Sequence, residues 1–331
     1  ETDLAEHIVQ LAGDRPSHIV WPSMHRTREQ VSALFKQSHQ QPHTEETIEA
    51  MVESARRELR DKFLTADVAI SGANFLIADS GATCTVTNEG NAELTTSPPR
   101  VHIVTAGIEK LVPSLSHAFS LLRLLVRSAT GAEVTQYTTF HCGPKQAGDL
   151  DGPEEFHIVL VDNGRSKMLA DASLREMLRC IRCGACMNHC VVFRQLGGHA
   201  YGGTYPGPMG AVLTPVLDGL EQSRELAHAC TLNGKCQEVC PVQIPLPTLL
   251  RGWRDRSWRD GLEPTTTRIG LGLFTFVASR PWLYRLGQGL ALRAMRLFGR
   301  QGWIIRMPGL GAWTRHRDFP VPEASSFMAQ Y

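Results

Sequence analysis

Seven of the nine cysteines fall into two short groups, and this grouping constrains the fold more than any other feature. The first group is CIRCGACMNHC, and the second is CTLNGKCQEVCP. A C-x2-C-x2-C-x3-C run cannot close its own disulfides without severe strain, but three of its thiolates can surround one iron–sulfur cubane while the fourth serves another. The two groups therefore predict two iron–sulfur clusters and electron transfer. Structural zinc is the alternative, but it uses four ligands per metal and would leave three cysteines over.

The cross-over rule of two-cluster ferredoxins gives the first cluster a complete set of ligands. Cys180, Cys183 and Cys186 take Cys240, the cysteine before proline, as their fourth ligand. We expect a [4Fe–4S] cluster there.

The second cluster is one thiolate short. It is left with Cys190, Cys230 and Cys236, and Asn233 stands where C-x2-C spacing would place a cysteine. The C-x5-C-x3-C-P spacing resembles the last ligand group of succinate dehydrogenase and fumarate reductase iron–sulfur subunits, where a three-iron cluster is bound. We expect either a [3Fe–4S] centre or a [4Fe–4S] centre with a non-cysteine ligand.

The use of cysteine indicates a cytoplasmic setting, and the overall charge bears on nucleic acid. Cys84 lies in the β-like run TCTVTN, which predicts a buried small hydrophobe, and Cys142 lies in a loop-like run. Thiolates without paired disulfide spacing are typical of a reducing compartment. A net charge of +1 predicts no binding of nucleic acid.

Residues 251–331 differ from the rest of the chain because they hold thirteen Arg, no Lys and five acidic residues, with five of the six Trp. Their longest apolar stretch, 269–278, is too short to span a bilayer. Basic and aromatic residues together favour an extension that docks a partner subunit or the inner face of a membrane. The alternative is that the extension packs along the chain's own two domains.

Hydrophobic periodicity divides the rest into residues 1–165 and 166–250. The first part alternates helices with strands and predicts an α/β domain with a mixed sheet. Its expected strands cover 18–21, 68–70, 75–77, 83–86, 101–105 and 156–161, and its helices cover 27–37, 44–66 and 113–127. We expect Thr44 to cap the second helix, which should pack on the sheet.

In the second part, a helix capped by Asp171 or Ser173 should run into Cys180, and another should follow Pro241. Between them, GGHAYGGTYPGPMGAVLTP is so rich in Gly and Pro that we expect a loop fitted closely over a cluster.

Two sets of side chains could add chemistry to this framework. Three basic residues flank the ligands and could stabilise a reduced cluster: Arg179, Arg182 and Lys235. A second set surrounds two strand ends of the α/β part, where small ligands often bind: Gly72, Asn74, Asp79, Ser80, Gly81, Asn88, Glu89, Gly90 and Asn91. Turn chemistry explains most of the second set equally well, and no catalytic residue is identified.

Both cysteine groups, the Gly/Pro-rich string and the upstream string GANFLIADSGATCTVTNEGNAELTTSPPRVHIVTAGIEKLVP make the chain resemble the lactate-utilisation protein B family. These proteins are iron–sulfur subunits of bacterial L-lactate oxidation systems. The resemblance covers about residues 1–251 and implies an α/β LUD domain of the NagB/RpiA/CoA-transferase-like class, followed by an all-α two-cluster helical ferredoxin domain. Relatives continue upstream of Glu1 and the chain lacks an initiating Met, so we expect its LUD domain to be incomplete at the N-terminal side.

The resemblance also implies ligand roles and partners. It assigns Cys180, Cys183, Cys186 and Cys240 to one cluster and Cys190 and Cys236 to the other. Many relatives have a cysteine at the position of Asn233, which leaves the role of Cys230 open. The implied partners are a cysteine-rich iron–sulfur protein and a second LUD-domain protein.

Two functions remain open from the sequence. The chain is either an electron-carrying subunit of a lactate-oxidising complex or an oxidoreductase whose LUD pocket acts on a small carboxylic acid directly. We expect the first, because the sequence contains no dinucleotide or flavin motif.

Overall fold

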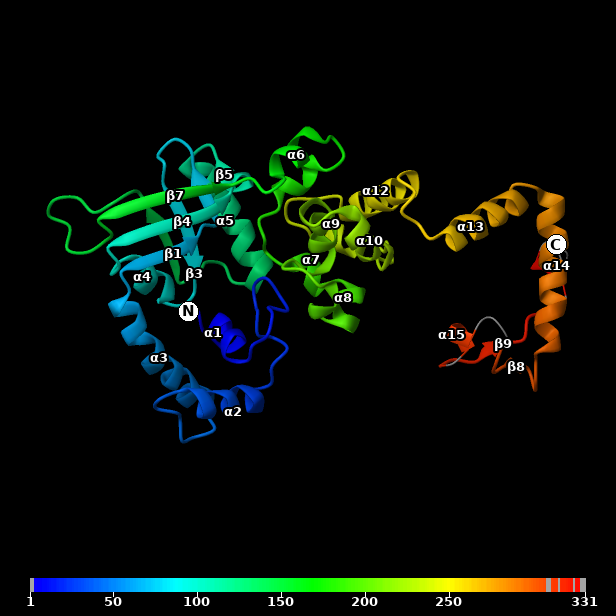
Figure 1. The fold of residues 1–331 in the computed structure, drawn as a ribbon, viewed down its shortest axis with the longest axis horizontal. Coiled ribbons are helices and arrows are strands. Elements are labelled where there is room, and N and C mark those ends of the chain that lie inside the picture. Colours follow the sequence, from blue (N-terminus) through cyan, green and yellow to red (C-terminus); the bar gives the residue numbers. More distant parts are fainter. Residues whose placement is uncertain (1–2, 308–310, 315, 324, 328–331) are drawn as a thin grey trace. The chain divides into compact units, whose positions relative to one another are not determined.

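The computed structural model describes residues 3–307, 311–314, 316–323 and 325–327. Its contacts divide the chain into two compact units, Glu1–Asp260 and Gly261–Tyr331. The first unit contains an α/β part followed by an entirely helical part, as the colours of Figure 1 show. This order confirms the predicted fold class.

Seven strands of the α/β part form two sheets rather than one mixed sheet. The first sheet is all parallel, with the order β1-β4-β7: β1 (Val68–Gly72), β4 (Val101–Gly107) and β7 (Glu155–Val161). The second is mixed, with the order β5-β2-β3-β6: β5 (Leu111–Val112), β2 (Phe75–Ile77), β3 (Thr83–Thr87) and β6 (Tyr137–His141). β5 and β6 were not predicted, because β5 has only two residues and the exposed half of β6 gives no clear alternation.

The N-terminal helices form a small core of their own. They are α1 (Leu4–Leu11), α2 (Arg28–Ser38) and α3 (Ile48–Thr65). Thr27 and Gln30 form the predicted capping box of α2. Thr47 caps α3, so the prediction of Thr44 is wrong. The buried face of α3 packs with Ile8 and Phe35 of the other two helices rather than on a sheet.

The predicted strand at residues 18–21 is absent. This segment is a turn, closed by a hydrogen bond from the Ser17 amide to the Pro22 carbonyl at 3.0 Å. The short apolar run instead lies against the helical part, where Ile19 packs on the core and the His18 ring contacts Phe193. Tertiary packing therefore uses these apolar residues without a strand.

α5 (Leu115–Thr130) covers the mixed sheet, and their shared core extends into the helical part. Phe75 and Cys84 from the sheet and Leu122 from α5 belong to one buried cluster with Ile181 and Cys183. Cys84 is fully buried, as predicted, and burial raises the pKa of its thiol to about 11. α4 (Asn91–Thr96), which was not predicted, connects β3 to β4. The first cysteine loop is thus packed directly against the α/β part.

The helical part consists of helices that pack around one buried helix, α9 (Gly207–Leu217). In chain order they are α6 (Arg165–Ala170), η2 (Arg175–Arg179), α7 (Ala185–Asn188), α8 (Val191–Leu196), η3 (His199–Tyr201), α9 (Gly207–Leu217), α10 (Leu220–His228), α11 (Lys235–Glu238) and α12 (Leu246–Arg259). The predicted helix before Cys180 is the 3₁₀ segment η2, with Leu174 rather than Asp171 or Ser173 at its N-cap.

α9 corrects the prediction of a loop through the Gly/Pro-rich string. Pro206 caps this helix and Pro208 lies in its first turn, where proline costs no hydrogen bond. All residues from Gly207 to Pro215 are buried, so tertiary burial outweighs the low helix propensity of Gly and Pro. Only the preceding residues, with η3, remain loop-like.

The second unit contains α13 (Thr265–Ala278), α14 (Pro281–Leu297), β8 (Trp303–Ile304), α15 (Gly311–Thr314) and β9 (Phe319–Pro320). No residue of α13 or α14, all of which are described, is buried. Helix α12 crosses residue 251, where the sequence placed the start of the C-terminal extension, and its Trp253 is buried in the first unit.

Gly210→Ala should destabilise the protein, because a Cβ at this position would collide with the Tyr205 carbonyl oxygen. We expect a loss of about 1–3 kcal/mol, the usual cost of overpacking. Gly252→Ala in α12 is the matched control, since its Cβ would enter open space and alanine favours a helix by about 1 kcal/mol. Anaerobic thermal unfolding should show a lower Tm only for the first variant. Equal midpoints would contradict the close packing of α9.

Candidate metal centre

Four cysteines from distant parts of the chain line one cavity of the helical part. They are Cys180, Cys183, Cys186 and Cys240, which we call the first cysteine set. Besides Arg182, the other residues of the lining have apolar side chains or, in the case of glycine, none: Ile19, Met177, Ile181, Gly184, Met209, Pro241, Val242, Ile244 and Leu246. The structure therefore brings together the four residues that the cross-over rule grouped. Thiolates, sulfur-containing side chains and a dry aliphatic wall fit an iron–sulfur cluster.

Two further cysteines, one from each sequence group, line a second cavity with Tyr201 and Leu250. These cysteines, Cys190 and Cys230, form with Cys236 the second cysteine set. Burial and, to a lesser extent, the neighbouring Cys230 and Cys190 raise the pKa of Cys236 to about 11, so the three sulfurs are close. The Tyr201 hydroxyl lies 4.0 Å from the Cys190 sulfur.

The two sites adjoin each other. Burial is the main cause that raises the pKa of Cys186 in the first set, and Cys236 of the second set adds to it. Burial likewise raises the pKa of Tyr201, which is also within reach of Cys190, Cys230 and Cys186. Because buried thiols hold their protons, a metal centre formed here must displace them. In the described part of the chain, no three His, Cys, Asp or Glu side chains are placed to hold a single metal ion. The assignment of cysteines to clusters therefore rests on which sulfurs line the same cavity.

The backbone of the first cysteine loop is repeated in the second. Arg182 and Gly184 have positive φ angles of 62° and 77°, and Leu232 and Gly234 have φ angles of 55° and 85°. In each loop these left-handed residues flank one central position. The repeat therefore puts Asn233 where the first loop has Cys183.

The side chain of Asn233 also makes the hydrogen bond expected at this position. Its Oδ1 accepts the Lys235 amide two residues ahead at 3.1 Å. The Cys183 sulfur likewise accepts from the amide of Ala185, two residues ahead of it. Backbone amides also donate to the sulfurs of Cys190, Cys230 and Cys240 at 3.3–3.5 Å.

Of the three basic residues that flank the ligands, only Arg182 faces the site. Arg179 pairs with Glu176 and Lys235 pairs with Glu238, all on the surface. Arg182 lines the first cysteine cavity and forms a buried ion pair with Glu109 from the α/β part. Sequence reasoning missed Glu109 and its neighbour Lys110, because the only local signal was a charged pair inside the apolar run IEKLV.

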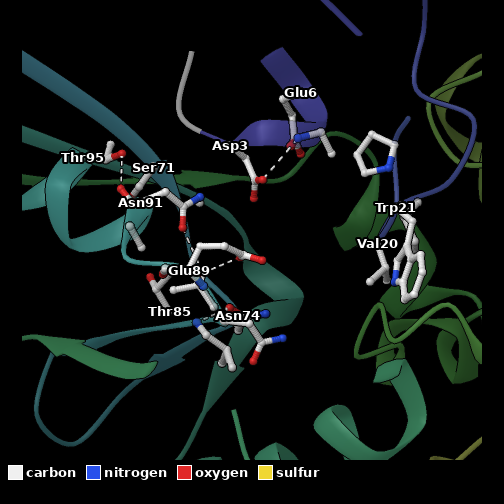
Figure 2. Close-up of a pocket in the computed structure, with 18 of the residues that line it drawn as sticks. Asp3, Glu6, Val20, Trp21, Ser71, Asn74, Thr85, Glu89, Asn91 and Thr95 are labelled. Carbon is white, nitrogen blue, oxygen red and sulfur yellow. Dashed lines mark hydrogen bonds between the residues drawn. The ribbon is translucent and has the colours of Figure 1, made fainter. Parts of the chain in front are cut away.

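A polar cavity of about 860 Å³ lies at the ends of β1 and β3 and extends to α1 and the 19–24 turn. Figure 2 shows side chains from these elements around one hollow. Of the polar residues expected around a ligand, Gly72, Asn74, Asn88, Glu89 and Asn91 line it. The described lining does not include the other four: Asp79, Ser80, Gly81 and Gly90.

The lining of the polar cavity is acidic. Burial raises the pKa of Glu6, and the nearby carboxylates of Asp3 and Glu89 raise it further. No Lys, Arg or His occurs among the described residues that line the cavity. One residue, Ile19, lines both this cavity and the first cysteine cavity.

Three known families match successive parts of the chain. Residues 1–161 match the LUD domain, 176–244 match the 4Fe-4S dicluster domain, and 259–330 match the C-terminal domain of lactate utilisation protein B. Among the described residues, no helix is long and apolar enough to cross a membrane.

Curated relatives align over almost the whole chain. Lactate utilization protein B of Bacillus licheniformis is 46% identical over 99% of this chain and 69% of its own length. The Bacillus subtilis protein of that name is 46% identical over 99% of this chain and 68% of its own length. An uncharacterized electron transport protein of Escherichia coli, YkgF, is 41% identical over 100% of this chain and 70% of its own length.

Proposed function

Because the chain belongs to the lactate utilization protein B family, we propose that it is the iron–sulfur electron-transfer subunit of a bacterial L-lactate oxidation system. The observation that carries this proposal is that four cysteines line one cavity and two line another, with Cys236 close to the second pair, within the dicluster domain. When bound, each cluster takes up and releases one electron at a time. The chain's own contribution is to bind the clusters, exclude water from them and hold them close together.

The first cysteine set supports a [4Fe–4S] cluster. Cys180, Cys183 and Cys186 supply three thiolates from one loop, and Cys240 supplies the fourth from the other end of the helical part. The aliphatic wall keeps water away, and backbone amides donate to the sulfurs. Both features set the potential of such a cluster.

The second cysteine set supports a cluster with one unusual corner. Cys190, Cys230 and Cys236 supply three thiolates, and the backbone repeat supports Asn233 as the residue that corresponds to the fourth ligand. A [3Fe–4S] centre lacks the iron at this corner, and a [4Fe–4S] centre would need a ligand other than cysteine there. Asn233 offers a neutral amide where iron–sulfur clusters take a thiolate, which favours three irons.

The alternative is that the polar cavity binds a small carboxylic acid and the chain acts on it directly. Its size suits a small ligand, and Ile19 connects it to the first cysteine cavity. However, Asp3, Glu6 and Glu89 would repel a carboxylate, and the described lining offers no cation to bind one. We therefore favour an electron carrier whose hydroxy acid is oxidised by the assembled complex.

The C-terminal extension is the part that we propose to dock a partner. In α13 and α14 the side chains of Ile269, Phe274, Trp282 and Leu297 are all more than half exposed, and the basic residues of the extension are all arginines or histidine. Exposed aromatic and arginine side chains are enriched at protein interfaces. The proposed partners are a cysteine-rich iron–sulfur protein and a second LUD-domain protein. The alternative binding surface for this basic extension is an anionic membrane. The proposed location is cytoplasmic, peripheral to the inner face of the membrane.

Anaerobically purified protein should contain about seven or eight iron atoms with matching acid-labile sulfide. If the second centre has three irons, the oxidised protein should show the EPR signal of a paramagnetic [3Fe–4S] centre. Asn233→Cys should remove this signal by completing a four-iron cluster, which is diamagnetic when oxidised. Stoichiometric zinc without sulfide would refute the proposal, and an unchanged signal in a fully loaded variant would show that Asn233 does not mark the vacant corner.

Cys240→Ser and Cys236→Ser should damage different clusters, although these cysteines are only four residues apart in one motif. The first variant should lose the four-iron signal of the reduced protein and keep the three-iron signal of the oxidised protein. The second should show the reverse. EPR of both redox states distinguishes them, and Cys142→Ser, an exposed cysteine outside both sets, is the control. Loss of the same signal in both variants would contradict the cross-over assignment.

Removal of residues 261–331 should leave both clusters in place and abolish assembly with the two partner proteins, because contacts divide the chain at Asp260. With both partners present, lactate should reduce the clusters of the full chain, as seen by EPR. Neither the full chain alone nor the truncated chain with its partners should be reduced. Lactate-driven reduction of the isolated chain would favour direct catalysis, and loss of the clusters on truncation would show that the extension completes the fold.

A further inference from the structure

The LUD domain reaches the first cysteine cavity through the 3₁₀ segment η1 (Ile108–Lys110), which connects β4 to β5. Its Glu109 carboxylate lies 3.1 Å from the Arg182 guanidinium and also contacts Arg165. The side chains of Glu109 and Arg182 are only 4% and 17% exposed, so solvent screens this ion pair little. A carboxylate from the LUD domain is thus buried against the loop that carries Cys180 and Cys183.

Arg182 is fixed at the wall of the cavity. It lies between Cys180 and Cys183 in the sequence, and its φ angle of 62° directs the chain around the site. Its guanidinium stacks over the Tyr205 ring at 4.6 Å and donates to the Met209 sulfur at 3.2 Å. Because these contacts immobilise the cation, Glu109 is its compensating charge.

Lys110, the next residue, brings a second cation to the same site. It is half-buried and follows directly on Glu109, whose ion pair with Arg182 holds η1 against the first cysteine loop, and the charge of Cys180 is among those that act on it. Burial, followed by the charge of Arg182, lowers the pKa of Lys110 to about 8. Within the described residues, its ammonium group has neither an ion-pair nor a hydrogen-bond partner. A cation withdrawn from water without a partner is costly, and a thiolate-bound cluster would supply the missing negative charge.

We propose that Glu109 and Lys110 of the LUD domain set the reduction potential of the first cluster in opposite directions. Reduction adds one electron and therefore one negative charge to the cluster. The Lys110 cation stabilises that charge and raises the potential, whereas Glu109 offsets Arg182 and Arg165 and lowers it. This inference rests on the proposed function, because it requires a cluster bound by the first cysteine set.

The opposite signs separate this role from a merely structural one. Loss of packing at the junction would expose the cluster to water in either variant and shift both potentials in the same direction. Electrostatic tuning predicts a lower potential without the Lys110 charge and a higher potential without the Glu109 charge. The second cluster provides an internal reference, because Arg182, the residue through which Glu109 meets the first cysteine cavity, is absent from the lining of the second.

The test is an EPR-monitored redox titration of full-length, anaerobically purified protein with Lys110→Met or Glu109→Gln. We expect about a tenfold fall in the equilibrium constant for reduction of the first cluster with Lys110→Met, which is about 59 mV for one electron, and a rise of similar size with Glu109→Gln. Lys110→Arg, which keeps the charge, should retain the wild-type potential. Lys167→Met, at an exposed lysine of α6, is the matched control and should change nothing.

Shifts of the same sign in both variants, or no shift in fully loaded protein, would overturn the inference. Wild-type protein without acid-labile sulfide would overturn the proposed function as well as this inference. Failure of the proposed function can therefore be told apart from failure of the inference alone. If Glu109→Gln does not retain its clusters, the potentials of Lys110→Met and Lys110→Arg are compared instead, and this comparison tests the inference by itself. Equal potentials for those two variants would show that the charge at this position has no effect.

Discussion

The continuous apolar core between the mixed sheet and the first cysteine loop is the constraint on which the rest of the structure depends. Ile181 and Cys183 are buried in the same cluster as Phe75 and Leu122, so the loop that bears three cysteines is held by the α/β part. A short helical domain that binds two clusters has little apolar surface of its own to bury. The α/β part supplies the missing wall, and the two domains are therefore one folding unit.

Helix α9 performs the corresponding task inside the helical part. It contributes Met209 to the first cysteine cavity and Pro208 and Ala211 to the second, so one buried helix separates the two sites and forms a wall of each. Its glycines permit this proximity, since Gly210 lies directly against the Tyr205 carbonyl and Gly207 against the Met187 side chain. Small residues in this helix reflect close packing rather than flexibility.

Sequence reasoning succeeded where the chemistry is local and failed where the tertiary structure decides. The cysteine spacing identified the motif, and the Thr27 capping box and most strands follow from short-range rules. The apolar turn at residues 18–21 was wrongly predicted as a strand because its partners lie in the helical part, far along the chain. α9 was missed because burial outweighed Gly and Pro propensity. Glu109 and Lys110 could not be found, since nothing near them in sequence indicates that Glu109 pairs with Arg182.

Ile19 lines two cavities, and its position bears on how easily oxygen reaches the first cysteine set. One of these cavities is large, polar and lined by carboxylates, and the other is small and lined by sulfur and aliphatic groups. A single branched side chain contributes to both linings, so at that point one residue of an irregular segment stands between a polar cavity and the sulfurs of the first cysteine set. A smaller residue at this position would therefore open a path for dissolved oxidants.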